Sequence, residues 1–220
     1  MLLKTCAIIT VMGAGRGKSR RTPSSQLSAT EVWDDGTKEW LREGKRHRDD
    51  GPALELADGS TEWWQHGYLH RLDGPAVEGK DGRKEWRLHG LLHREDGPAV
   101  EAINGGEEWW LNGLLHRQGG PARTFPNGTE EWYLQGQRHR DGAPAVKYSD
   151  GMISWWQHDR KHREDGPAVE YRNGKKEWWL NNKRVDKEAF EEIRNMREAE
   201  AKMTARAEDM RARTSERITF

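Results

Sequence analysis

Six histidines stand at equivalent places in a repeated pattern, and histidine is both a common metal ligand and a common general base. They are His47, His70, His93, His116, His139 and His162. In a sheet with two strands per repeat, equivalent atoms of neighbouring repeats lie about 10 Å apart. Zinc ligands lie about 2 Å from their ion, so neighbouring copies cannot share one. We therefore expect no metal and no cofactor, and we interpret His70 and His93 as structural residues.

The other residue types that could take part in catalysis also recur together in each repeat. An active site is a single constellation of side chains with distinct roles. Here His, Arg, Asp and Glu repeat together, and the only cysteine, Cys6, lies near the N-terminus. No unique nucleophile stands beside a base. We expect no catalytic residue, and a small enzyme ranks third among the functions considered.

A ladder of tryptophans sets the period of the repeat at 23 residues. Its members are Trp40, Trp63, Trp86, Trp109, Trp132, Trp155 and Trp178. A fixed period of this length is typical of repeat architectures, in which each unit buries apolar surface against its neighbours. The composition, 33% hydrophobic against 34% charged residues, fits such an array.

Two turn positions punctuate each repeat. One is Asp-Gly or Asn-Gly, as at Asp58-Gly59, and the other is a glycine such as Gly67, replaced by Asp159 and Asn182 in the last two repeats. Asx-Gly between alternating segments predicts a two-residue type I′ hairpin turn. Two such turns per repeat predict an antiparallel meander.

The predicted turns also fix a register. Trp63 should lie opposite His70 and Leu54, and Glu62 opposite Arg71, which would form a cross-strand ion pair. The recurring Gly-Pro-Ala segment should bend the return strand, because proline cannot donate to a ladder.

Aromatic residues beside the ladder are the candidates for binding a partner. They are Trp64, Trp110, Tyr133, Trp156 and Trp179, which alternate with arginine on the predicted mixed face. Aromatic and arginine side chains are enriched at protein interfaces, although a row of this kind also completes a core if the sheet is covered. Arg123 and Phe125 depart from the repeat consensus and join these candidates.

The motif Trp64-x-x-Gly67-x-x-His70, followed by Asp73-Gly74, resembles MORN repeats and extends over about residues 33–185. The segment His-Arg-x-Asp-Gly-Pro-Ala departs from the family's usual His-Gly-x-Gly and looks closest to its divergent bacterial and viral branch. The resemblance implies an elongated single sheet and a scaffolding role. We therefore predict an all-β fold: an elongated antiparallel meander of repeated β-hairpins (MORN-like) with a C-terminal α-helix. Its function would be to bind another protein along the sheet, without catalysis.

Residues 1–32 form a basic leader, which we expect to be disordered. Its short apolar run also resembles a weak secretory signal. The single cysteine favours a reducing compartment, so we predict a cytoplasmic protein, with export as the alternative. Equal numbers of acidic and basic residues, 37 each, argue against a global field that would attract nucleic acid. Binding of a polyanion or of lipid headgroups through the arginine rows and the leader is the alternative function, with nucleic acid or a membrane surface as the partner.

The period changes after Val185. Asp186 is suited to cap a helix, and Ala189, Ile193, Met196, Met203, Ala207 and Met210 follow at helical spacing. We predict a charged amphipathic helix over residues 186–220. It either covers the last hairpin or forms a homodimer seam through residues 186–213.

Overall fold

The computed structural model describes residues 30–218, which belong to two compact units, residues 1–126 and residues 127–220. The predicted fold class is confirmed, since both units are built from antiparallel hairpins and the chain ends in an α-helix. The expectations for residues 1–29, a leader or a secretory signal, lie outside the described residues. The sheet already includes residues 30–32, which had been assigned to the leader.

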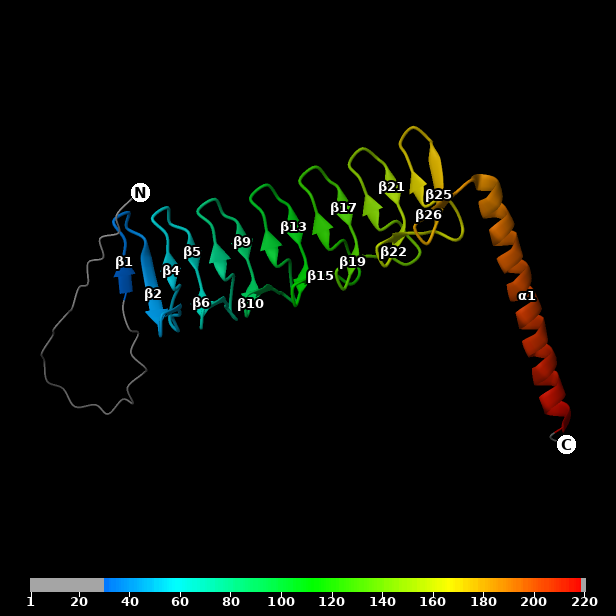
Figure 1. Ribbon diagram of the computed structural model, residues 1–220, viewed down its shortest axis with the longest axis horizontal. Helices are drawn as coiled ribbons and strands as arrows, with labels where there is room; N and C mark the ends of the chain where they lie inside the picture. The colour runs from blue at the N-terminus through cyan, green and yellow to red at the C-terminus, as the bar shows by residue number, and fades with distance from the viewer. Residues whose placement is uncertain (1–29, 219–220) are drawn as a thin grey trace, which may run out of the picture. The chain divides into compact units, whose positions relative to one another are not determined.

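The first unit contains a main sheet and a set of separate small hairpins. In spatial order the main sheet contains β1 (Thr30–Val32), β2 (Lys38–Arg42), β4 (Leu54–Glu55), β5 (Thr61–Glu62), β8 (Val77–Glu78), β9 (Lys84–Glu85), β12 (Val100–Glu101), β13 (Glu107–Glu108) and β16 (Arg123–Thr124). The hairpins are β6 (Trp64–Gln65) with β7 (Tyr68–Leu69), β10 (Arg87–Leu88) with β11 (Leu91–Leu92), and β14 (Trp110–Leu111) with β15 (Leu114–Leu115), while β3 (Lys45–Arg46) pairs with β2. Figure 1 shows β4, β5 and β9 side by side, with β6 and β10 at one end of them.

The second unit repeats this plan and adds the helix. Its main sheet contains β17 (Glu130–Glu131), β20 (Val146–Lys147), β21 (Ile153–Ser154), β24 (Val169–Glu170), β25 (Lys176–Leu180) and β26 (Lys183–Val185). Its small hairpins are β18 (Tyr133–Leu134) with β19 (Gln137–Arg138), and β22 (Trp156–Gln157) with β23 (Arg160–Lys161). The helix α1 spans Lys187–Ile218.

The small hairpins close with the predicted type I′ turns. His66 and Gly67 have φ values of 52° and 85°, and Asp159 has φ 60° in place of a glycine. Type I′ turns require positive φ at both central residues. Their register also agrees with the prediction, since the His70 amide donates to the Trp63 carbonyl at 2.9 Å and Trp64 pairs with Leu69.

The Asx-Gly turns are of a different type, and the register predicted across them is wrong by one residue. Here the Leu56 amide donates to the Ser60 carbonyl and only Gly59 has positive φ. This is a three-residue loop with a type I turn and a glycine bulge. Asp58 Oδ1 accepts from the Ser60 amide at 2.8 Å and supports the turn.

The extra loop residue changes which side chains share a face. Leu54 pairs with Glu62, and Glu62 pairs on its other side with Val77. A one-residue shift in register moves a side chain to the opposite face of a sheet. Trp63 therefore does not lie opposite Leu54, as the two-residue turn had predicted.

The Gly-Pro-Ala segments form the predicted bends and supply much of the core. The alanine of each segment is fully buried, at 0% exposure, in Ala53, Ala76, Ala99, Ala122, Ala145 and Ala168. Its carbonyl accepts from the ladder tryptophan of the same hairpin, as Ala76 does from the Trp63 amide at 2.7 Å. Valines of the main sheet, such as Val146 and Val169, add to this core.

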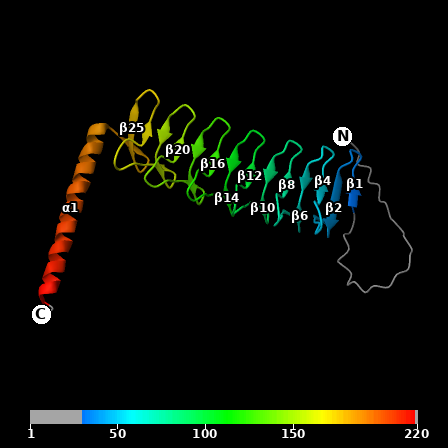
Figure 2. The same cartoon turned by 180° about the vertical axis from the view of Figure 1, so that it is seen from behind.

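Helix α1 begins as predicted, and only its N-terminal part packs on the strands of the second unit. Asp186 Oδ1 accepts from the Ala189 amide at 2.8 Å, which caps the N-terminus. Phe190 is buried at 2% exposure, and α1 contacts β25. From Asn195 to Arg213 every residue is exposed, and Figure 2 shows the helix leading away from β25. Only the first turns therefore cover the last hairpin.

Candidate interaction surface

The repeated arginines stack on the ladder tryptophans of their own repeats. The guanidinium carbon lies 3.8–4.2 Å from the ring centroid in Arg48–Trp40, Arg71–Trp63, Arg94–Trp86, Arg117–Trp109, Arg140–Trp132 and Arg163–Trp155. Stacked cation–π pairs of this kind stabilise by about 0.5–2 kcal/mol, depending on how far they are removed from solvent. These arginines are therefore part of the framework.

A glycine lies close to the stacked guanidinium in five of the repeats, at Gly51, Gly74, Gly97, Gly120 and Gly166. A Cβ added at Gly74 would lie 2.9 Å from Arg71 Cζ, and one added at Gly97 would lie 2.6 Å from Arg94 Cζ. The close approach of arginine thus favours glycine at this position of Gly-Pro-Ala. In the second unit Ala143 occupies this place, and Gly142 replaces the preceding aspartate.

Hydrogen bonds complete the arginine site, and they correct the predicted ion pair. Arg71 Nε donates to Asp73 at 2.9 Å, while Nη1 donates to the Pro75 carbonyl at 3.1 Å and to Glu78 at 3.0 Å. Arg71 thereby holds the pKa of Asp73 below its usual value. The predicted Glu62–Arg71 pair does not form, because the chain bends at Trp63 and Glu62 pairs within the main sheet instead.

Glu62 has a different partner, the aromatic residue two positions later. Trp64 Nε1 donates to Glu62 at 2.8 Å, and the same bond joins Trp110 to Glu108. In the sixth repeat, where serine replaces glutamate, Trp156 Nε1 donates to Ser154 Oγ at 2.8 Å. The residue at this position therefore accepts the indole N–H bond of the tryptophan two positions later. We call the five aromatic candidates, Trp64, Trp110, Tyr133, Trp156 and Trp179, the aromatic row.

Four of the histidines, His47, His70, His93 and His162, accept a hydrogen bond from a backbone amide in the left-handed turn of the next repeat. His47 Nδ1 accepts from the His66 amide at 3.0 Å, and His70 Nδ1 accepts from the His89 amide at 3.2 Å. An Nδ1 that accepts must be unprotonated. Burial lowers the pKa of His70 below its usual value, and His89 adds to the effect. The structure thus places these histidines in structural positions.

The five aromatic candidates are neither buried in a core nor fully exposed. Trp64, Trp110, Tyr133, Trp156 and Trp179 are all half-buried. Basic side chains cover several of the rings: Arg46 lies 5.1 Å from the Trp64 centroid, Arg138 lies 4.4 Å from that of Trp156, and Lys161 lies 4.8 Å from that of Trp179. Much of each ring is therefore already in contact.

The two candidates that depart from the consensus lie together in the first unit. Arg123 Cζ lies 5.7 Å from the Phe125 centroid, and Arg123 Nε lies 2.9 Å from Glu108. Phe125 is 38% exposed. This pair sits beside the aromatic row through Glu108, which also accepts from Trp110.

A second row, which the sequence analysis missed, is more exposed. It consists of Tyr68, Leu91 and Leu114, which follow the left-handed glycines of three successive hairpins and are 59%, 52% and 48% exposed. Each pairs with the residue across its hairpin, Leu91 with Leu88 and Leu114 with Leu111. We call these three residues the apolar row. Its signal in the sequence is an apolar residue directly after the turn glycine in three consecutive copies.

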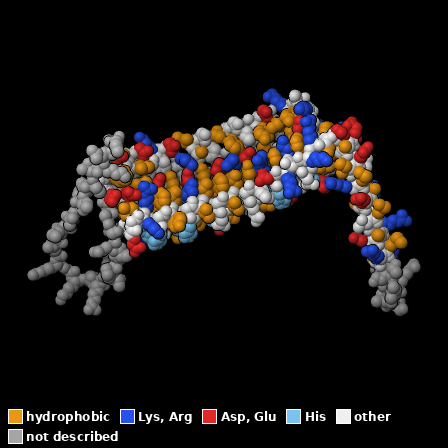
Figure 3. Space-filling view, viewed as in Figure 1, with side chains coloured by type: hydrophobic (Ala, Val, Ile, Leu, Met, Phe, Trp, Pro, Cys, Tyr) orange, Lys and Arg blue, Asp and Glu red, His pale blue; other side chains and the backbone are white. Residues whose placement is uncertain are grey.

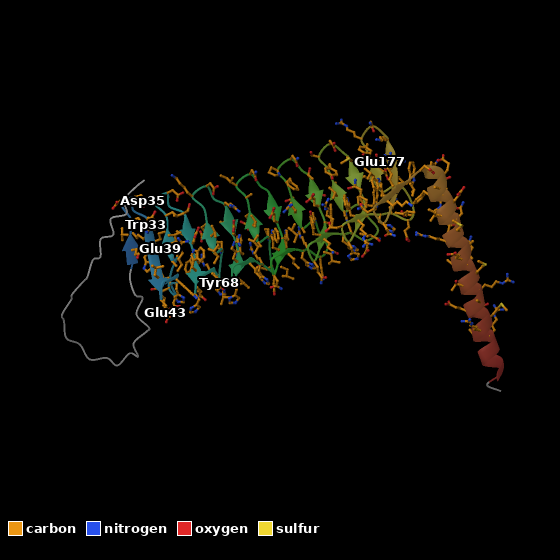
Figure 4. The ribbon with its side chains drawn as sticks, viewed as in Figure 1. Trp33, Asp35, Glu39, Glu43, Tyr68 and Glu177 are labelled. Atoms are coloured by element: carbon orange, nitrogen blue, oxygen red, sulfur yellow. The ribbon has the colours of Figure 1, made fainter. Side chains whose placement is uncertain are left out.

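Adjacent members of the apolar row lie over the neighbouring hairpin. A Cβ at Gly90 would lie 3.5 Å from Tyr68, and one at Gly113 would lie 3.2 Å from Leu91. Figure 4 shows Tyr68 and Glu43 toward one end of the strands and Asp35 toward the other end. Figure 3 shows hydrophobic side chains gathered over the strands of the first unit, with charged side chains between them. In the flanking repeats the residue directly after the turn glycine is polar, Lys45 in one and Gln137 in the other.

A depression of about 560 Å³ in the first unit is lined by loop residues including Asp58, Ser60, Lys80 and Asp81. Within the described residues, no three His, Cys, Asp or Glu side chains are placed to hold a metal ion. No helix in that part of the chain is long and apolar enough to cross a membrane.

Comparison with protein-family models gives no match, and comparison with curated protein sequences gives none either.

Proposed function

We propose that the chain is a non-catalytic, MORN-like repeat scaffold that binds a partner protein along its sheet. The observation that carries the proposal is that the repeated polar residues are held in contacts within the fold, whereas one set of apolar residues is exposed. Arg71 and its equivalents are stacked and hydrogen-bonded, and four histidines accept a hydrogen bond from the next repeat, namely His47, His70, His93 and His162. The apolar row instead exposes large side chains on three adjacent hairpins. Contiguous exposed apolar surface rimmed by polar residues is typical of protein-interaction sites.

The spacing of the apolar row favours a helical partner. Successive hairpins are separated by two strands, or about 10 Å. A helix rises about 1.5 Å per residue, so side chains seven residues apart are separated by about 10.5 Å. A partner helix with apolar side chains at this interval, lying across the hairpins, would place one of them against each of Tyr68, Leu91 and Leu114.

The polyanion alternative has less support from the contacts of the arginines. Arg48, Arg71, Arg94 and Arg163 each bind two carboxylates besides stacking on tryptophan. Phosphate contacts need cationic groups that are free to replace counterions. Binding that weakens steeply with added salt would favour the polyanion alternative over a partner protein.

The test is a capture experiment with surface variants of the full chain. We expect Leu91→Glu and Leu114→Glu each to weaken capture of a specific helical partner by about tenfold or more, the effect of losing an interface hot spot. The matched control is Ile103→Glu, since Ile103 is 68% exposed in the same unit but lies outside the apolar row. Circular dichroism would show that all three variants fold.

Quantitative mass spectrometry would compare the proteins retained by each variant, and binding would then be measured for the purified candidate. A partner lost equally with Ile103→Glu, or retained with both leucine variants, contradicts the proposed surface. Loss of binding on Trp110→Ala and Trp156→Ala, with both leucine variants unaffected, would move the site to the aromatic row.

A further inference from the structure

Helix α1 carries a heptad pattern in which Glu200 is the one charged residue. Ala189, Ile193, Met196, Glu200, Met203, Ala207 and Met210 alternate at steps of four and three residues. This places Ile193, Glu200 and Ala207 at a positions and the others at d positions of a coiled-coil seam. Met196, Met203 and Met210 are 59%, 65% and 60% exposed, although they form the apolar stripe of the helix.

The packing of α1 on its own sheet stops before this stripe ends. Phe190 is buried, Ile193 and Arg194 are half-buried, and Arg197 Nη1 donates to Glu164 at 2.9 Å. From Asn195 to Arg213, more than four helical turns stand exposed. Isolated helices are marginally stable in water, and most helical stability comes from packing of an apolar face. The stripe therefore has the properties of a contact surface.

We infer that two copies of this chain associate through residues 193–213 of α1 in an antiparallel pair. In an antiparallel coiled coil, a positions face d positions. The register that uses the whole seam places Ile193 opposite Met210 of the second copy, and Met196 opposite Ala207. Glu200 then lies opposite Met203. This inference concerns α1 alone and does not rest on the proposed partner surface.

The charges beside the seam select the antiparallel orientation. The g positions are Glu192, Ala199, Arg206 and Arg213, and the e positions include Arg197 and Arg211. In the antiparallel register Glu192 faces Arg213 of the second copy twice, by symmetry, and no two like charges face each other. A parallel pair would place Glu192 against Arg197 favourably, but it would also place Arg206 against Arg211 twice and bring the two Glu200 side chains into one layer. Charges at e and g positions set partner orientation in this way.

The first test is the mass of the full chain, measured by analytical ultracentrifugation over a range of concentrations. We expect the mass to rise from that of one chain, 25.5 kDa, toward twice that value. Met203→Glu should abolish the rise, while Ala205→Glu, on the outer face of the helix, should not. A mass that stays at one chain, or a dimer that persists with Met203→Glu, overturns the inference. Circular dichroism would confirm that α1 stays helical in both variants.

Charge exchange tests the orientation. Glu192→Arg and Arg213→Glu should each weaken association, and the double variant should restore it. Failure of the double variant to restore association excludes the antiparallel register.

Distances between spin labels give an independent check, in a Cys6→Ser background. Labels at position 198 should lie about 10 Å apart along the helix axis, and labels at position 212 about 30 Å apart, from the helical rise per residue. Equal separations at both positions would show a parallel pair and overturn the inference.

Discussion

Replacing Gly97 with alanine tests the stacked arginine site directly. A Cβ at this position would lie 2.6 Å from Arg94 Cζ and 2.8 Å from Nε, well inside van der Waals contact. The guanidinium also lies 4.0 Å from the centroid of the Trp86 ring, which restricts where it can move. We therefore expect Arg94 to be displaced from its site.

The cost follows from the contacts that Arg94 gives up. Its Nη1 donates to the Pro98 carbonyl at 3.1 Å, a bond that contributes about 1 kcal/mol. The stack on Trp86 contributes about 0.5–1 kcal/mol for a partly exposed cation. The ion pairs with Asp96 and Glu101 add a few tenths each, because Asp96 is 84% exposed. We expect Gly97→Ala to lower the free energy of unfolding by about 2–3 kcal/mol.

Urea denaturation followed by tryptophan fluorescence would measure this loss, and amide exchange would localise it to the affected repeat. The control is Gly106→Ala, since Gly106 is also buried but its nearest neighbours lie at 3.4 Å. The sequence Gly142-Ala143 shows an arrangement that tolerates alanine, with Arg140 still 4.0 Å from Trp132. Asp96→Gly combined with Gly97→Ala should therefore be more stable than Gly97→Ala alone. A loss below about 0.5 kcal/mol for the single variant, or a fully additive loss for the double variant, would refute the reasoning.

Three further predictions concern other contacts of the repeat. The pKa of His70 is lowered in the folded state. As the pH falls below about 6.5, the ordinary pKa of histidine, the unfolded chain therefore binds more protons than the folded chain. Stability should be greatest above that pH and fall below it, and His70→Asn, whose side-chain oxygen accepts from the His89 amide without titrating, should flatten thermal unfolding curves measured from pH 7.5 to 5.5; an unchanged slope contradicts this. Ala99→Leu, at a position with 0% exposure, should lower stability by about 1–3 kcal/mol through overpacking, measured by urea denaturation, and a neutral effect would contradict the core assignment. Trp110→Phe removes the indole bond to Glu108 and should lower stability by about 0.5–1.5 kcal/mol, whereas the same change in a Glu108→Gln background should have a smaller effect.

The period and the turn chemistry allowed the fold to be predicted from the sequence. The pairing of Trp63 with His70 and the replacement of a turn glycine by Asp159 could both be predicted, because both depend on local backbone preferences. The Asp58-Gly59 turn was not determined in the same way, since Asx-Gly fits both a two-residue and a three-residue loop. The Ser60 amide bond to Asp58, which accompanies the longer loop, is visible only in the structure.

The side-chain partners were harder to predict than the backbone. Arg71 has acidic residues within reach on several strands, and its long side chain selects Asp73 and Glu78 over Glu62 only because the chain bends at Trp63. By contrast, the Glu62–Trp64 bond joins residues two positions apart, a spacing that the sequence already offered. The apolar row was also present in the sequence, as a residue type that recurs after the turn glycine.

The bond from the next copy to His70, repeated at His47, His93 and His162, has a consequence for how such a chain changes length. His70 Nδ1 reaches only the backbone of the adjacent copy, so a whole copy forms a removable module. Excising residues 75–97 would join Gly74 to Pro98 and restore an intact Gly-Pro-Ala junction. Deleting a number of residues that is not a multiple of 23 would instead place a histidine beside backbone that is not the left-handed turn it bonds. Gene-level gain and loss of these copies should therefore proceed in whole steps.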